Sequence, residues 1–331
     1  FTRDIRSGHQ STDGLVVPFV YSLNNTQGPV RATNWLEQKA IRSVYGSVNF
    51  DIFKSTYLNI SGRNDWSSTL SAANYSYFYP SVSLSSVLSD YFTISPAVDY
   101  LKVYSSWARV SNDLTPYNTS STFVKDVTYG STPSVSYPSG IVNPNILPER
   151  STSLEAGLAF SLLKNRLALD FTYYNVLDEN QIIDLSISQA SGFSSRKVNG
   201  NEYRTNGLEV MLNASPVKNN RLTWNVGLNW SKYVQKLTAI YGDQERYGNF
   251  KVGDRADSYY TTVWQRSADG RLILNQNTGM PIQDPYAKNI GHLNPDWQFG
   301  FLNTLKVKDF TINVDIDGAI GGVMNSNTIE K

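Results

Sequence analysis

The sequence predicts an all-β protein, a transmembrane antiparallel β-barrel with long extracellular loops. Three observations predict it. Apolar and polar residues alternate along many segments, each segment has roughly the 9–11 residues with which a tilted strand crosses a bilayer, and short and long connections alternate. Because hydrocarbon offers no hydrogen-bond partner, strands can cross a membrane only in a sheet that closes on itself.

The clearest alternation lies in residues 221–231. There Leu222, Trp224, Val226, Leu228 and Trp230 alternate with small or polar residues. The same pattern predicts strands at 44–52, 56–63, 100–110, 152–162, 166–174, 206–214, 297–306 and 310–317. Weaker alternation adds 79–88, 15–23 and the first few residues, which makes about eleven strands.

The connections support a barrel with unlike ends. Short turns are expected at 53–55, 163–165, 215–220 and 307–309, and long polar segments at 64–77, 111–150, 175–203 and 232–295. Tight turns at one end and long loops at the other are typical of outer-membrane barrels. The link at 89–98 fits neither class.

Composition excludes several other classes of protein. Aromatic residues make up 13% of the chain and charged residues only 17%, which is low for a water-exposed surface. A net charge of +1 without a Lys/Arg run argues against nucleic-acid binding. The absence of cysteine removes disulfides and thiolate metal sites, and no apolar run approaches the roughly 18 residues of a membrane helix.

A soluble β-sandwich or propeller is the alternative fold, since its core also produces alternating strands. Two features weigh against it. The segments are longer than the roughly 5–6 residues usual in soluble sheets. Their apolar faces are rich in Leu, Trp, Phe and Tyr, and aromatic residues such as Trp224, Trp230, Tyr173 and Trp297 suit the headgroup level of a bilayer.

Several segments resemble one known family. Residues 58–70 read LNISGRNDWSSTL and residues 77–92 read YFYPSVSLSSVLSDYF. LKVYSSWARVSN from Leu101, NPNILPERSTSLEAGLAF from Asn143, RTNGLEVMLNA from Arg204 and the stretch from Ile290 follow in the same order. The chain therefore resembles the SusC/RagA family of TonB-dependent outer-membrane transporters, although Trp66 stands where that family's motif has a glycine.

The resemblance implies a fold, a location and partners. It implies a 22-stranded barrel in the bacterial outer membrane, of which residues 1–331 are expected to be about half of the single barrel domain, with the plug domain and the last strands outside this sequence. It also implies a SusD-like lipoprotein lid, energy from the TonB complex through the plug, and an oligosaccharide or peptide substrate. No cofactor is expected.

Candidate substrate-binding residues lie in the segments predicted to be extracellular, because such loops meet the substrate first. Aromatic side chains there are candidates for stacking on sugar rings, and polar side chains for accepting hydroxyl hydrogen bonds. The candidates are Asp65, Trp66, Tyr75, Asn112, Asp113, Tyr117, Tyr129 and Trp264. For each aromatic residue the competing interpretation is packing within its own loop or in the interfacial belt.

Catalytic chemistry finds little support in the sequence. His9 and His292 are the only histidines, and no phosphate-binding loop or zinc-protease motif is present. Glu155, Asp170 and Glu209 fall on polar strand faces, where they can bind plug side chains or lumen water as readily as act as a glycosidase pair. The sequence therefore favours an importer over an enzyme, with a siderophore receptor or a non-transporting adhesin as alternatives.

Overall fold

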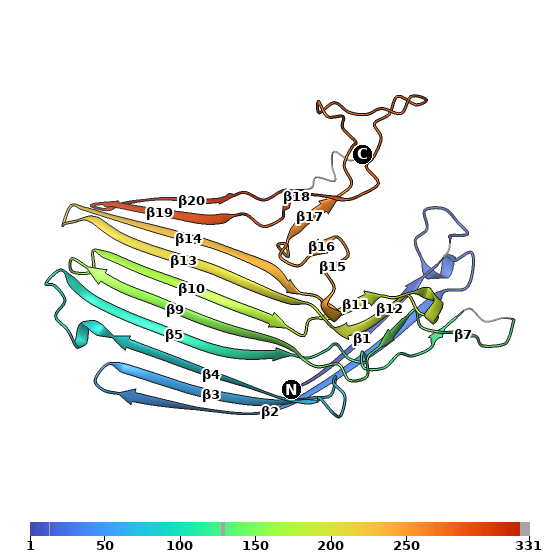
Figure 1. The fold of residues 1–331 in the computed structure, drawn as a ribbon, viewed down its shortest axis with the longest axis horizontal. Coiled ribbons are helices and arrows are strands. Elements are labelled where there is room, and N and C mark those ends of the chain that lie inside the picture. The colour runs from blue at the N-terminus through green and yellow to red at the C-terminus, as the bar shows by residue number, and fades with distance from the viewer. Residues whose placement is uncertain (13, 127–129, 325–331) are drawn as a thin grey trace.

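The computed structural model describes residues 1–12, 14–126 and 130–324, and its regular secondary structure is almost entirely β. Eleven strands of the described residues form one antiparallel sheet in which chain neighbours are also spatial neighbours (Figure 1). In sheet order they are β1 Thr2–Ser11, β2 Arg31–Ile52, β3 Thr56–Ser67, β4 Ser76–Val87, β5 Val98–Asn112, β9 Glu149–Leu162, β10 Leu167–Glu179, β13 Glu202–Lys218, β14 Leu222–Ala239, β19 Trp297–Val307 and β20 Phe310–Ile320. The sheet is open, with β1 and β20 at its edges.

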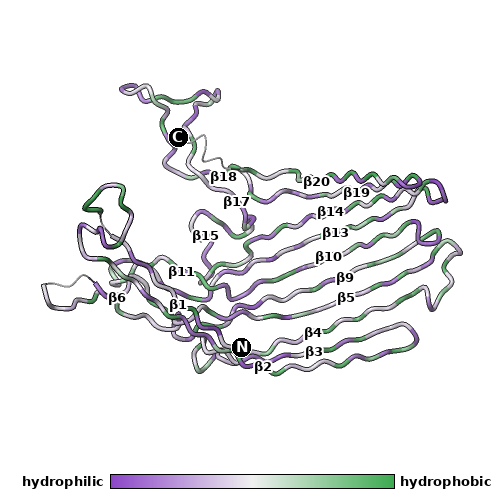
Figure 2. Tube along the Cα trace, turned by 180° about the vertical axis from the view of Figure 1, so that it is seen from behind, coloured by the Kyte–Doolittle hydropathy of each residue, from purple (hydrophilic) through white to green (hydrophobic). Residues whose placement is uncertain are grey.

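The pairing confirms the two unlike faces that the alternation predicts. Leu158, Val103 and Phe171 share one row across the sheet, while Glu155 and Ser106 share a row on the other side. We call the first side the apolar face and the second the polar face. Figure 2 shows hydrophobic and hydrophilic residues alternating along the wall strands, as expected when one face meets lipid and the other water.

Short turns and long connections are segregated to opposite ends of the sheet, as Figure 1 shows. At one end β2 and β3 are joined by residues 53–55 and β19 and β20 by 308–309; the link at 88–97 also lies at this end and contains η2, Leu88–Asp90. At the other end lie the longer connections, with described residues 12 and 14–30, 68–75, 113–126 and 130–148, 180–201 and 240–296. We call these five segments the loop layer.

The loop layer has its own small elements. They are η1 Leu23–Asn25, β6 Val124–Lys125, β7 Val135–Ser136, β8 Gly140–Val142, β11 Ile182–Ser186, η3 Gln189–Ser191, β12 Ser195–Asn199, η4 Tyr241–Asp243, β15 Arg246–Tyr247, β16 Phe250–Lys251, β17 Ser258–Thr261 and β18 Lys288–His292. β11, β12 and β8 form a three-stranded sheet. In the described residues no helix has the length and apolar character needed for a membrane span.

Several predicted boundaries are wrong. β2 already begins at Arg31, and β14 runs to Ala239, into the predicted loop at 232–295. Residues 15–23 form no strand, because Pro18 interrupts the segment and the Asn25 side chain bonds to the backbone of Val17 and Val20, which folds it into a compact turn. The predicted loop at 64–77 is shorter than expected, since β3 continues to Ser67 and β4 begins at Ser76, which leaves 68–75 as the connection.

Buried apolar side chains are confined to the loop end. The six described ones are Leu70, Leu114, Ile146, Val198, Leu237 and Ile240. In the wall, Leu154 is 49% exposed and Ile316 51% exposed. The wall therefore has no water-excluded core of its own, and its apolar face requires a non-aqueous surrounding.

On the polar face, two tyrosine rings lie over glycines, in the space that a larger side chain at the glycine would take. The Tyr104 ring lies over Gly157, and the Tyr174 ring lies over Gly207, so closely that a Cβ on either glycine would come within 2.1 Å of a ring carbon. Tyr104 also bonds to Asp170 at 3.2 Å and to Thr172 at 2.7 Å. These contacts tie β5, β9 and β10 together across the polar face.

Candidate functional site

Asp113 organises the part of the loop layer above β3 and β5. Its carboxylate pairs with the Lys39 ammonium group, and it accepts hydrogen bonds from the hydroxyls of Ser67 and, at 3.0 Å, Thr69. The Asp113 side chain is 4% exposed and the Lys39 side chain 19% exposed. A carboxylate so far removed from water is stable only because a cation and two donors surround it.

A second cluster lies beside it on the polar face of β3 and β4. Arg63 Nε donates to Asp65 at 2.7 Å, and its other nitrogen donates to Ser43 at 2.9 Å. Tyr79 donates its hydroxyl to Asp65 at 2.5 Å. Arg63 and Asp65 meet because residues two apart on a strand lie on the same face.

A small apolar core supports both clusters. Leu70, Leu114 and Ile146 pack together, with Tyr77 and Ile182 against them. The Asn74 side-chain amide, in a separate contact, donates to the carbonyls of Asn145 and Ile146 at 3.1 and 3.2 Å. Three distant segments of the chain are thereby fixed over the end of the wall.

The long segment at 240–296 has a separate anchor at its base. Arg255 forms two 2.9 Å bonds to Asp257 and one of 3.3 Å to Asp296. Burial favours a raised pKa for Asp257, but the bonds from Arg255 and from the Asn294 amide outweigh it, and the pKa is lowered.

A neighbouring carboxylate, Asp254, is stabilised in the same way. The Lys251 amide donates to it at 2.9 Å and the Tyr260 hydroxyl at 2.7 Å. These two bonds lower the pKa of Asp254, the amide contributing more. Both carboxylates are therefore ionised at neutral pH.

The candidate residues fall into three groups. Asp65 and Asp113 are buried and already have partners, and Asn112 lies 3.5 Å from Glu149. Tyr75, Tyr117 and Trp264 are 46%, 60% and 51% exposed, and Tyr117 accepts a 3.2 Å bond from the Gln38 amide. Tyr129 lies outside the described residues.

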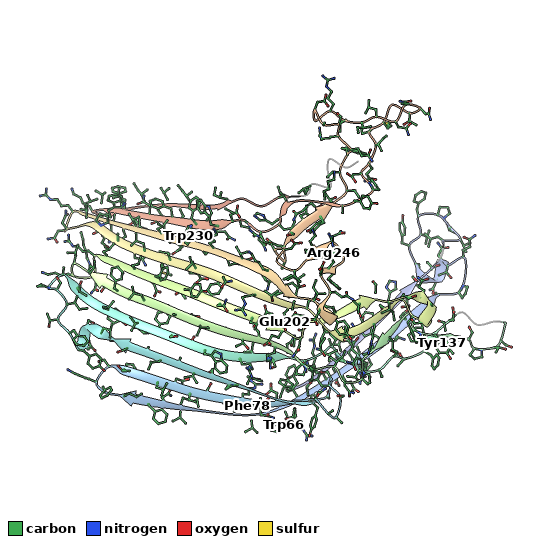
Figure 3. The ribbon with its side chains drawn as sticks, viewed as in Figure 1. Trp66, Phe78, Tyr137, Glu202, Trp230 and Arg246 are labelled. Carbon is green, nitrogen blue, oxygen red and sulfur yellow. The ribbon has the colours of Figure 1, made fainter. Side chains whose placement is uncertain are left out.

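Trp66 lies on the opposite face of the sheet from the candidate Asp65. It pairs with Ser76 on the apolar face, one residue along β3 from Asp65, so the two side chains leave opposite sides of the sheet. Figure 3 labels Trp66 and Phe78 together at the loop end of the wall, far from Tyr137 in the loop layer. A contact of Trp66 with a substrate on the polar side stays a prediction.

Residues that the sequence did not single out complete the clusters. Lys39, Ser67 and Thr69 hold Asp113, and Arg63 and Tyr79 hold Asp65. Strand parity places Arg63 beside Asp65 once β3 extends to Ser67. Nothing in the sequence joins Lys39 to Asp113, which are 74 residues apart.

The polar face of the wall is hollowed between β10 and β20. A cavity of about 670 Å³ is lined by side chains that include Asp170, Glu209, Ser231, Gln298 and Asp317. Among the described residues no group of His, Cys, Asp and Glu is arranged to hold a metal ion. The arrangement offers hydrogen-bonding and anionic groups along a surface.

Comparisons with known proteins agree with this architecture. The family model described as "TonB dependent receptor-like, beta-barrel" matches residues 3–317. "TonB-dependent receptor P3" of Formosa agariphila is 24% identical over 93% of this chain and 35% of its own length. "TonB-dependent receptor P26" of the same organism is 24% identical over 85% of this chain and 32% of its own length.

A solved structure shares the fold. The RagAB peptide transporter superposes with a TM-score of 0.78 at 18% identity, over 97% of this chain and 38% of the solved chain. Its "open-open" state gives a TM-score of 0.77. The chain thus spans about a third of the length of the curated relatives it matches.

Proposed function

This chain belongs to the TonB-dependent receptor β-barrel family of the bacterial outer membrane, and from that premise we propose that the complete protein is an importer of oligosaccharides or peptides. In this proposal the apolar face meets the lipid, the polar face lines the lumen, and the loop layer is extracellular. The described residues form part of one barrel whose remaining strands and plug lie outside residues 1–331. The chain carries out no covalent chemistry.

The observation that supports a bulky cargo is the likeness in fold to the RagAB peptide transporter over 97% of the chain. It extends from the wall strands into the loop layer, where a cargo too large for a simple pore would first be bound. Exposed Tyr75, Tyr117 and Trp264 offer aromatic surface there. A sugar ring or a peptide side chain can stack on each of them.

We propose different roles for the buried carboxylates. Asp65 and Asp113 have their hydrogen-bonding capacity committed to internal partners. They therefore hold the segments that carry Tyr75 and Tyr117 in position over the lumen. Asn112 and Trp264, which are exposed, remain for cargo contact.

The proposed partners are a SusD-like surface lipoprotein and the TonB complex. The lipoprotein would close over the loop layer, and TonB would act through the plug. The test is to purify the complete protein from native outer membranes and to identify co-purifying lipoproteins and small molecules by mass spectrometry. We expect one lipoprotein in stoichiometric amount together with oligosaccharide or peptide.

Uptake of the recovered ligand is then compared in cells with and without TonB. We expect uptake to be lost without TonB. Recovery of an iron chelate without a lipoprotein would identify a siderophore receptor instead. Surface binding that never leads to TonB-dependent uptake would favour the adhesin.

A further inference from the structure

The apolar face of the wall becomes cationic where it meets the loop layer. On β5, β9, β10, β13 and β14 the charged residues that share this face are Arg109, Arg150, Arg204, Lys232 and Lys236, with the two carboxylates Glu179 and Glu202. Six of them lie near the loop ends of their strands, and Lys232 lies further along β14, in the row of Leu208 and Tyr173. Toward the short turns, the same face of these strands carries no charged side chain in the described residues.

The polar face of the same strands has the opposite charge. Glu149, Glu155, Asp170, Asp178 and Glu209 lie on it, against Lys102 and Lys218. The cations on the apolar face are thus not a general property of this wall. They are confined to the face that meets lipid and to the level of one membrane surface.

A groove lies within this cationic band. It has a volume of about 280 Å³, and Arg109 and Arg150 line it together with Ser76, Ser111 and Asn180. Phe78 and Leu147 add apolar surface to its walls. The groove therefore offers donors beside apolar side chains, as a lipid headgroup and its acyl chain require.

The two arginines of the groove differ in whether their nitrogens already have partners within the protein. Arg150 pairs with Glu179 at 2.9 Å. Arg109 lies over the Trp107 ring at 5.6 Å, and its Nε is buried without a hydrogen-bond partner among the described residues. A buried donor without a partner costs free energy unless a ligand accepts from it.

We propose that this groove binds the phosphate-bearing headgroup of an outer-leaflet lipid. Guanidinium groups bind phosphate through paired hydrogen bonds, and a phosphate seated on Arg109 would satisfy its free Nε. Arg204, which donates a 3.3 Å bond to Asn175, and Lys236, its cross-strand neighbour on β14, extend the cationic surface along the band. Acyl chains would lie on the apolar rows toward the short turns, around Leu158 and Leu228.

The test uses the complete protein in detergent and native mass spectrometry. Three probes are added in turn: lipid A with two phosphates, the same lipid A with its phosphates removed, and inorganic phosphate. We expect the phosphorylated lipid to be retained at least roughly fivefold better than the dephosphorylated one, the size expected for each arginine at a membrane surface. Equal retention of the two lipids overturns the proposal, and so does inorganic phosphate that displaces the lipid at equal concentration.

Variants locate the site. Arg109→Gln should lower retention of the phosphorylated lipid roughly fivefold. Arg221→Gln, in the exposed turn at the opposite end of β14, should leave it unchanged. Equal loss in both variants, or no loss in Arg109→Gln, contradicts the assignment. If Arg109→Gln does not fold, as judged by heat-modifiable migration in gels, the comparison of the two lipids on the unaltered protein decides.

Discussion

The wall and the loop layer of this molecule are stabilised in opposite ways. The wall holds its strands by backbone pairing and leaves side chains such as Leu154 and Ile316 about half exposed. The loop layer buries Leu70, Leu114 and Ile146 and surrounds Asp113 with polar partners. One region depends on a lipid surrounding, and the other has the small core and ion pairs of a water-soluble domain.

The sharpest way to break this comparison is to place charge on the apolar face. Leu158→Arg and Leu228→Arg should each prevent assembly of most of the protein, because a cation at mid-bilayer costs about 2–4 kcal/mol. Ser153→Arg, on the polar face, should assemble nearly as well as the unaltered protein. The yield of heat-modifiable protein in outer membranes measures this, and similar yields for all three variants would show that the faces are assigned wrongly.

In the loop layer the largest effect should come from the buried ion pair. Asp113→Ala leaves Lys39 and two hydroxyls without their acceptor and should cost about 2–3 kcal/mol, less than a fully buried pair because Lys39 keeps some access to water. The exposed pair of Lys197 with Asp184 is the control, and Asp184→Ala should cost less than about 1 kcal/mol.

Hydrogen exchange of residues 68–75 reports this local loss. The amides there should exchange faster in Asp113→Ala, while those of β14 keep their protection. Unchanged exchange at 68–75 would mean that the ion pair does not hold this segment.

A smaller effect should come from crowding the polar face of the wall. Gly157→Val would push the Tyr104 ring out of its place and break its bonds to Asp170 and Thr172, at about 1–3 kcal/mol. Gly46→Val, on the apolar face, is the uncrowded control, since no atom beyond its two chain neighbours lies within 4 Å of a Cβ at Gly46. Urea titration of refolded protein in vesicles compares the two, and a Gly46 variant as unstable as the Gly157 variant would rule out the ring contact as the cause.

The smallest effect should be seen with pH. The pKa values of Asp254 and Asp257 are lower in the folded protein than in the unfolded chain. Their contribution to stability is therefore complete above the unfolded pKa of about 4, and it is lost as the pH falls through the folded pKa values. Below that pH, residues 246–296 should exchange amide hydrogens faster than the wall does. If the amides of residues 246–296 already exchange faster at pH 6, groups other than these two carboxylates hold the segment.

The same division explains what the sequence could predict. A strand with one face toward lipid and one toward water has a sequence period of two, so the central parts of the wall strands from β2 to β20 and their two faces are predicted. The strand ends are not, since β2 begins at Arg31 and β14 runs to Ala239. The loop layer has no such period. The pair of Lys39 with Asp113 depends on how separate segments fold over each other, and the compact turn at residues 15–23 depends on side-chain bonds from Asn25.

Candidate binding residues were predictable only where strand parity applies. The sequence placed Asp65 and Trp66 together in a predicted loop, and only the extension of β3 to Ser67 puts Arg63 beside Asp65 and Trp66 on the opposite face. Strand parity also revealed the cations on the apolar face once the pairing of β5, β9 and β13 fixed the rows. Exposure of Tyr75, Tyr117 and Trp264 depends on loop conformation and required the structure.

The most direct test of this account is a spin-label scan of residues 222–231 on β14, which is practical because these 331 residues contain no cysteine. A label at each position of the complete protein in lipid vesicles is exposed to oxygen, which concentrates in lipid, and to a water-soluble nickel chelate. Oxygen contact should peak at positions 224, 226, 228 and 230 and fall at the positions between them. A profile without this period of two, or one with its peaks at 225, 227 and 229, would contradict the account.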